Sequence, residues 1–139
     1  MFTLHPQLQA DTVLIGQLPL CQLLLMNDAN YPWWVLVPAR SDKREWFELE
    51  SIDQQQLLRE SNSLAQFVQQ KTAAKKMNIA ALGNVVSQLH VHVVARFEND
   101  AAWPAPVWGK TPARDYEPDA LAAMLALSRE FLDGVLRAG

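Results

Sequence analysis

Apolar and polar residues alternate most regularly around residues 88–93, where Gln88, His90 and His92 are separated by leucine and valine. This period of two predicts a β-strand whose successive side chains point to opposite faces. Two of the chain's three histidines are therefore expected side by side on one face, together with Gln88. Just upstream, Gly83 and Asn84 predict a turn whose backbone amides face a ligand.

Three other apolar runs predict strands, at residues 20–26, 33–38 and 77–82. The first two are joined by a short polar segment rich in turn residues, which predicts an antiparallel hairpin. Asn27 and Asp28 begin this segment, either to form the turn or to reach a ligand at the strand end. A further apolar run at residues 13–15 is too short to assign, and the charged connection that follows the hairpin has room for a short strand around Trp46.

Two segments have the spacing of amphipathic helices. The first begins after a predicted capping box, Ser51 to Gln54, and is expected to run from Ile52 to about Lys76, with lysines in its last turn. The second is expected to begin near Pro118. Between the last strand and this helix, residues 99–109 are rich in tryptophan and proline and are expected to form a loop. We therefore expect one domain spanning residues 1–139.

Composition narrows the possible functions. The chain has 139 residues, a net charge of −3 and a pI of about 5.5, so a broad nucleic-acid-binding surface is not expected. The single cysteine, Cys21, lies in an apolar run and is expected to be a buried, inert thiol. No stretch has the length of a membrane span, and the N-terminus lacks the pattern of a signal peptide, so a cytoplasmic location is expected.

Three kinds of site are compatible with His90 and His92. Both could be structural histidines that are satisfied by hydrogen bonds in the core. Both could bind a metal, but zinc needs three or four ligands, and His5, Cys21 and the scattered carboxylates have no informative spacing. His5, beside Pro6, is interpreted as a surface or capping residue. The third possibility is phosphoryl or nucleotidyl transfer, in which one histidine is the nucleophile and amides hold the phosphate.

The segment from Gln88 to Val94 resembles the signature of the HIT (histidine triad) superfamily, in which three histidines alternate with apolar residues. The resemblance spans roughly residues 18–96, and the C-terminal region is similar to extensions of some bacterial HIT-domain proteins. It implies an α+β fold, in which helices pack on an antiparallel sheet of about five strands. One departure stands out: Gln88 occupies the position of the first histidine, and glutamine holds no charge near neutral pH.

The resemblance also implies roles for individual residues. His90 matches the nucleophile, His92 matches the third histidine, and Gln88 and His92 flank the α-phosphate. Further polar residues match positions for the phosphate and for the ribose, namely Asn78 and Asn84 for the phosphate and Asn27 for the ribose, with Asp28 as a substitute for Asn27.

The implied activity is a nucleotide hydrolase or nucleotidyltransferase of the histidine triad type. It would act on the α-phosphate of a nucleoside phosphoramidate or a dinucleoside polyphosphate through a nucleotidyl-histidine. The resemblance implies no metal and no cofactor, a nucleotide as the partner rather than DNA, RNA or a membrane, and a homodimer. The alternative is a nucleotide-binding or interaction module in which Gln88 has weakened or abolished catalysis.

Overall fold

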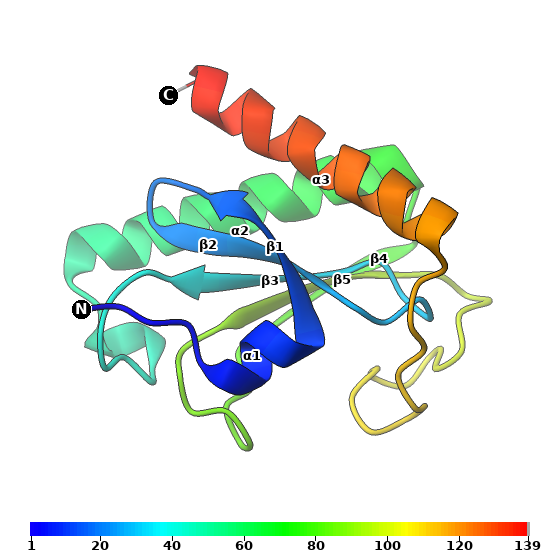
Figure 1. The fold of residues 1–139 in the computed structure, drawn as a ribbon, viewed down its shortest axis with the longest axis horizontal. Coiled ribbons are helices and arrows are strands. Elements are labelled where there is room, and N and C mark those ends of the chain that lie inside the picture. Colours follow the sequence, from blue (N-terminus) through cyan, green and yellow to red (C-terminus); the bar gives the residue numbers. More distant parts are fainter. Residues whose placement is uncertain (139) are drawn as a thin grey trace.

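Five strands form one antiparallel sheet in the order β1-β2-β3-β5-β4 (Figure 1). The computed structural model describes residues 1–138. The strands are β1 Thr12–Gln17, β2 Cys21–Met26, β3 Trp33–Pro38, β4 Lys76–Ala80 and β5 Val91–Arg96. The expected α+β sheet and the hairpin formed by β2 and β3 are confirmed, and the apolar run at residues 13–15 lies within β1.

The helices cover both faces of this sheet unequally. Their bounds are α1 Pro6–Asp11, η1 Trp46–Glu48, α2 Ser51–Thr72 and α3 Pro118–Ala138. The long helices α2 and α3 share one hydrophobic cluster with the sheet, whereas α1 packs in a second cluster on the opposite face (Figure 1). Within residues 1–138, no helix has both the length and the apolar character to cross a membrane.

The strand period of two divides the central strands between these clusters. In β5, Val91 and Val93 join the cluster under the long helices, while Val94 joins the opposite one. In β3, Trp34 faces the long helices and Trp33 faces the other side. Both faces are therefore buried at the centre of the sheet, although only one of them is covered by long helices.

The start of α2 differs from the prediction. The N-cap is Glu50, and its side chain makes no capping hydrogen bond. Gln54 donates to the carbonyl of Leu49 instead of reaching back to the amide of Ser51. The serine is already the first helical residue, so the capping-box register is wrong by one position. A capping box is formed instead at η1, between Glu45 and Glu48, where a short strand was expected.

The end of α2 also comes earlier than expected. Ala73 adopts a left-handed conformation (φ 57°), and its amide donates to the carbonyl of Gln69. This closes the helix at Thr72 and turns the chain toward the sheet. Lys75 and Lys76 consequently lie along the sheet edge: the amide of Lys75 donates to the carbonyl of Arg96, at the end of β5, and Lys76 begins β4. They are not residues of the last helical turn.

Candidate active site

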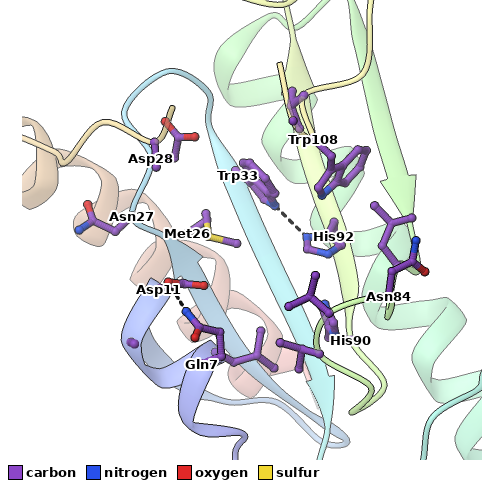
Figure 2. A pocket seen from close by; sticks show the side chains of 18 of the residues that line it. Gln7, Asp11, Met26, Asn27, Asp28, Trp33, Asn84, His90, His92 and Trp108 are labelled. Carbon is purple, nitrogen blue, oxygen red and sulfur yellow. Dashed lines mark hydrogen bonds between the residues drawn. The ribbon is translucent and has the colours of Figure 1, made fainter. Parts of the chain in front are cut away.

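A cleft of about 670 Å³ lies on the sheet face opposite α2 and α3. Volumes of about 300–1,000 Å³ are typical of small-molecule sites. Figure 2 shows both histidines and Asn84 at one end, and Asn27 and Asp28 at the other. The cleft is formed by α1, the ends of β2 and β3, the approach to β5 and the loop after it, through Gln7, Leu8, Ala10, Asp11, Met26, Asn27, Asp28, Trp33, Leu82, Asn84, Val85, Val86, His90, His92, Val107, Trp108, Gly109, Thr111, Ala113 and Asp115.

The two histidines lie together, but the predicted strand face is only partly formed. β5 begins at Val91, so His92 lies in the strand and His90 immediately precedes it. Their rings remain adjacent, with centroids 4.8 Å apart. The approach is longer than expected, because ten residues separate Ala80, at the end of β4, from Val91. This irregular approach includes a hydrogen bond from the amide of Leu89 to the carbonyl of Lys43, outside the sheet.

Gln88 does not share the cleft with the histidines. Its Oε1 accepts from the amide of His5 at 2.9 Å, and its Nε2 donates to the carbonyl of Thr3 at 2.9 Å. Both polar ends of the side chain are therefore bound to the N-terminal segment. His5 itself caps α1 by accepting from the amide of Gln7, which confirms its interpretation as a capping residue.

The hydrogen bond of His90 determines which nitrogen is free for chemistry. Its Nδ1 lies 2.6 Å from the carbonyl oxygen of Gln88. A carbonyl only accepts, so Nδ1 must carry the proton, and Nε2 keeps its lone pair. The side chain is buried, and this burial lowers the pKa of His90; the bond to Gln88 opposes the shift, and the nearby charge of His5 adds to it. The neutral, nucleophilic form is thus favoured near neutral pH.

His92 also has its Nδ1 in a hydrogen bond and its Nε2 free, but its neutral tautomer is the opposite of that of His90. The indole Nε1 of Trp33 donates to its Nδ1 at 3.0 Å. Because an indole N–H only donates, Nδ1 must be the unprotonated nitrogen, and the neutral ring carries its proton on Nε2. Burial, and secondarily the charge of His90, lowers the pKa of His92 to about 3. His92 is therefore a neutral hydrogen-bond donor.

Two tryptophans surround the ring of His92. Trp33 and Trp108 contact it edge-on, with centroid distances of 5.6 and 5.2 Å, and they contact each other at 5.8 Å. Trp33 comes from the start of β3, whereas Trp108 comes from the proline-rich loop. The indole N–H of Trp108 is buried and has no hydrogen-bond partner within residues 1–138. The aromatic contacts restrict the rotation of His92 and exclude water from one side of its ring.

The expected polar residues divide into two groups. Asn84 and Asn27 line the cleft. Asn78 does not: its Oδ1 accepts from Arg96 at 2.8 Å, within a buried network in which Arg96 also pairs with Asp100. Asn78 therefore helps to hold the turn after β5 and lies away from the expected phosphate site.

The charge of the cleft wall was not apparent from the sequence. Three carboxylates line it, those of Asp11, Asp28 and Asp115, and no lysine or arginine does so within the described part of the chain. Nor does any group of three or more His, Cys, Asp or Glu side chains in residues 1–138 suit a metal ion. The carboxylates come from α1, the β2–β3 turn and the segment before α3, so only the tertiary structure brings them together.

Several other cleft residues also escaped the sequence analysis. Trp33 was interpreted only as a strand residue, because an apolar pattern does not show which indole bonds a histidine. Trp108 and Asp115 lie in a loop without periodicity. The short helix α1 was not predicted, although its signals, a capping histidine followed by Pro6 at the first helical position, are present in the sequence.

Comparisons with known proteins agree with this fold. The HIT domain family matches residues 7–99. Histidine triad proteins of known structure are similar over nearly the whole chain. The one from Marinobacter aquaeolei VT8 is 45% identical, with a TM-score of 0.94, over 97% of this chain and 98% of its own. The one from Sinorhizobium meliloti 1021 is 47% identical, with a TM-score of 0.90, over 94% and 96%.

A third histidine triad protein, from Bradyrhizobium japonicum, is 43% identical, with a TM-score of 0.91, over 93% of this chain and 96% of its own. No curated protein matches the sequence. The likeness to these structures continues past residue 99, where the family match ends, because 97% of the chain is covered. The proline-rich segment and α3 are thus part of the shared structure. On the family match and these relatives, the chain belongs to the HIT domain family.

Proposed function

We propose that the protein is a nucleotide hydrolase or nucleotidyltransferase that acts on an α-phosphate through a nucleotidyl-histidine at His90. Family membership supports the nucleotide-binding and hydrolase class. The observation that carries the finer proposal is the bond from Nδ1 of His90 to the carbonyl of Gln88, which leaves Nε2 unprotonated. An unprotonated imidazole nitrogen in a ligand-sized cleft is the group that such a reaction requires.

The proposed reaction has two steps. In the first, the lone pair of His90 Nε2 forms a bond to the α-phosphorus, and the bond from phosphorus to the leaving group breaks. The imidazole becomes positively charged, and the carbonyl of Gln88 stabilises the proton on Nδ1. In the second, water attacks the phosphorus, loses a proton to solvent and releases neutral His90. A transferase would use another acceptor in place of water.

The neighbouring donors would hold the phosphoryl oxygens. Within residues 1–138, the Nε2–H of His92 donates to no protein group, and Trp33 occupies Nδ1. Asn84 lines the same end of the cleft and supplies an amide donor (Figure 2). Both groups are neutral, so they stabilise the phosphate by hydrogen bonds that are positioned in advance rather than by net charge. This arrangement suits a single phosphate group.

The charge of the cleft supports nucleoside phosphoramidates over dinucleoside polyphosphates as substrates. A polyphosphate carries several charges, and polyphosphate sites characteristically hold lysine, arginine or a metal. Here three carboxylates line the wall, and within the described residues no lysine or arginine does. Within the described residues, the cleft wall therefore offers no cationic side chain to offset the charge of further phosphates.

One observation favours the alternative of a binding module with little catalysis. Gln88 is bound at both polar ends to the N-terminal segment, so it takes no part in moving protons. In this alternative the cleft would bind a nucleotide without turning it over. Calorimetry that shows binding of a nucleoside monophosphate, with no release of nucleotide from any phosphoramidate, would support it.

The test of the main proposal is direct. The protein is incubated with a nucleoside phosphoramidate, quenched with base and examined by mass spectrometry for a nucleotidyl adduct on the peptide that contains His90. Turnover should be lost in His90→Ala. Gln70→Asn is the control: it changes an exposed position of α2 outside the cleft and should keep its turnover. Equal turnover by His90→Ala and the parent would refute the proposal.

We further propose that the chain functions as a single domain within a homodimer. β4 is an edge strand of the sheet in residues 1–138, and Ile79 on it is 45% exposed. Exposed apolar edge strands favour pairing with another chain. Sedimentation equilibrium at micromolar concentration should give twice the mass of 15.7 kDa, and a mass of one chain would contradict the dimer.

A further inference from the structure

The segment before α3 is bound closely to the turn between β2 and β3. The amide of Ala29 donates to the carbonyl of Arg114 at 2.6 Å, and Asn30 donates to the carbonyl of Pro112 at 3.0 Å. The hydroxyls of Tyr31 and Thr111 are 3.0 Å apart. This segment lies beyond the residues matched by the HIT domain family, yet it lines one end of the cleft. It can therefore supply a ligand contact that the family motif does not contain.

The residue expected to contact the ribose is already engaged by this segment. Asn27 donates from Nδ2 to Oδ1 of Asp115 at 3.2 Å, and its Oδ1 accepts from the amide of Tyr116 at 3.1 Å. The side chain of Asn27 is thus oriented toward the segment. Its neighbour Asp28 is 5% exposed and accepts from Asn30 and Arg114 through Oδ1. These two residues hold the segment in place.

Asp115 is the carboxylate that this arrangement presents to the cleft. It is exposed and lines the cleft, and its Oδ1 is held by Asn27. Within residues 1–138, its Oδ2 accepts no hydrogen bond. A carboxylate accepts several hydrogen bonds and donates none, so it suits a ligand group that presents adjacent hydroxyls. A ribose is such a group, and it would lie at the end of the cleft away from the histidines.

We propose that Asp115, oriented by Asn27, accepts the hydrogen bonds of the ribose hydroxyls and makes the enzyme selective for ribonucleotides. The inference rests on the proposed function, because it assumes a nucleotide whose phosphate lies at His90. Asp11 is the nearest competing carboxylate: the amide of Asn27 donates to its backbone carbonyl, and its side chain lines the cleft and accepts from Gln7. Asp115 is favoured over Asp11 because Asn27, which donates to Oδ1 of Asp115, has both of its polar side-chain atoms in hydrogen bonds.

The experiment compares a ribonucleoside 5′-phosphoramidate with its 2′,3′-dideoxy counterpart. The parent protein should prefer the ribonucleotide in kcat/KM by about tenfold, as expected for hydrogen bonds to a charged group at an accessible site. In Asp115→Asn the retained Oδ1 still accepts from Asn27, but the other atom becomes an N–H₂ donor. The ratio of the two kcat/KM values should fall to about one, because kcat/KM decreases for the ribonucleotide and stays unchanged for the dideoxynucleotide. Asp133→Asn, on an exposed position of α3, is the matched control and should keep the preference.

Three outcomes would overturn the inference. One is an unchanged preference in Asp115→Asn. Another is an equal loss with both substrates, which would show that Asp115 only supports the turn. The third is loss of the preference in Asp11→Asn alone. If the parent turns over neither substrate, the proposed function fails, and calorimetry with the ribonucleoside and dideoxynucleoside monophosphates decides the inference separately. Weaker binding of the ribonucleotide alone by Asp115→Asn would still support it.

Discussion

Replacement of Gln88 by histidine tests whether this position belongs to the chemistry or to the fold. In the structure Gln88 makes two hydrogen bonds to the N-terminal segment, one as acceptor from His5 and one as donor to Thr3, both 2.9 Å long. At about 0.5–1.5 kcal/mol for each bond, and with partial exposure, the pair contributes roughly 1–2 kcal/mol to the docking of this segment. A neutral histidine ring has one donor and one acceptor nitrogen, but the rigid ring does not place them where the nitrogen and oxygen of the longer glutamine side chain lie.

We therefore expect Gln88→His to loosen the N-terminal segment without raising kcat. A loss of about 1–2 kcal/mol corresponds to a 5–30-fold increase in local opening. Native-state hydrogen exchange can measure this at the amide of Gln9, which donates to the carbonyl of His5 in α1. Because α1 forms one wall of the cleft, KM should rise if opening competes with binding.

Two controls sharpen the comparison. Gln88→Glu keeps an acceptor for the amide of His5 but loses the donor to Thr3, so its loss of protection should resemble that of Gln88→His. Gln70→His places the same residue on an exposed position of α2 and should change neither protection nor rate. A tenfold or larger gain in kcat in Gln88→His, with the protection of Gln9 unchanged, would refute this reasoning and identify the position as a degraded member of the triad.

Three further predictions follow from buried polar contacts. Trp33→Phe leaves Nδ1 of His92 without its donor, so urea unfolding should show a loss of about 1–3 kcal/mol, and kcat should fall more than KM rises. Folding lowers the pKa of His92 from about 6.5 to about 3, so between these pH values only the unfolded state binds the proton. The free energy of unfolding should therefore decrease by about 1–2 kcal/mol from pH 7 to pH 5. A free energy of unfolding that does not change over this range would contradict the prediction. Glu60→Gln replaces a buried carboxylate that accepts from the amides of Leu20 and Cys21, and thermal unfolding should show a free energy of unfolding about 2–3 kcal/mol lower. A decrease of less than about 0.5 kcal/mol would contradict this prediction.

Periodicity predicted the sheet well because burial on both faces depends on the pattern itself. β3 was predicted with its observed bounds, and β2 and β4 within two residues at each end. Element ends were less predictable, because they depend on individual backbone conformations. The left-handed Ala73 that ends α2 carries no glycine signal, and the side chains of Ser51 and Gln54 match a motif whose register the helix does not use.

The site was predictable where the motif is local and unpredictable where it depends on distant segments. The adjacency of His90 and His92 follows from their spacing. The partner of Gln88 does not, since its hydrogen bonds join residues 83 and 85 positions apart. Asn78 matched a family position by sequence, yet the buried guanidinium of Arg96 takes its oxygen. Long-range polar contacts of this kind do not follow the period of a helix or a strand, so the pattern of apolar and polar residues does not reveal them.

The protonation states around His90 constrain the chemistry that the cleft can support. Burial keeps His90 and His92 neutral, Trp33 can only donate, and Gln88 is committed to the N-terminal segment. None of these groups can give a proton to a leaving group near neutral pH, so that proton must come from solvent or from the substrate. An amine leaving group of a phosphoramidate meets this condition, since it can take its proton from water as the bond to phosphorus breaks.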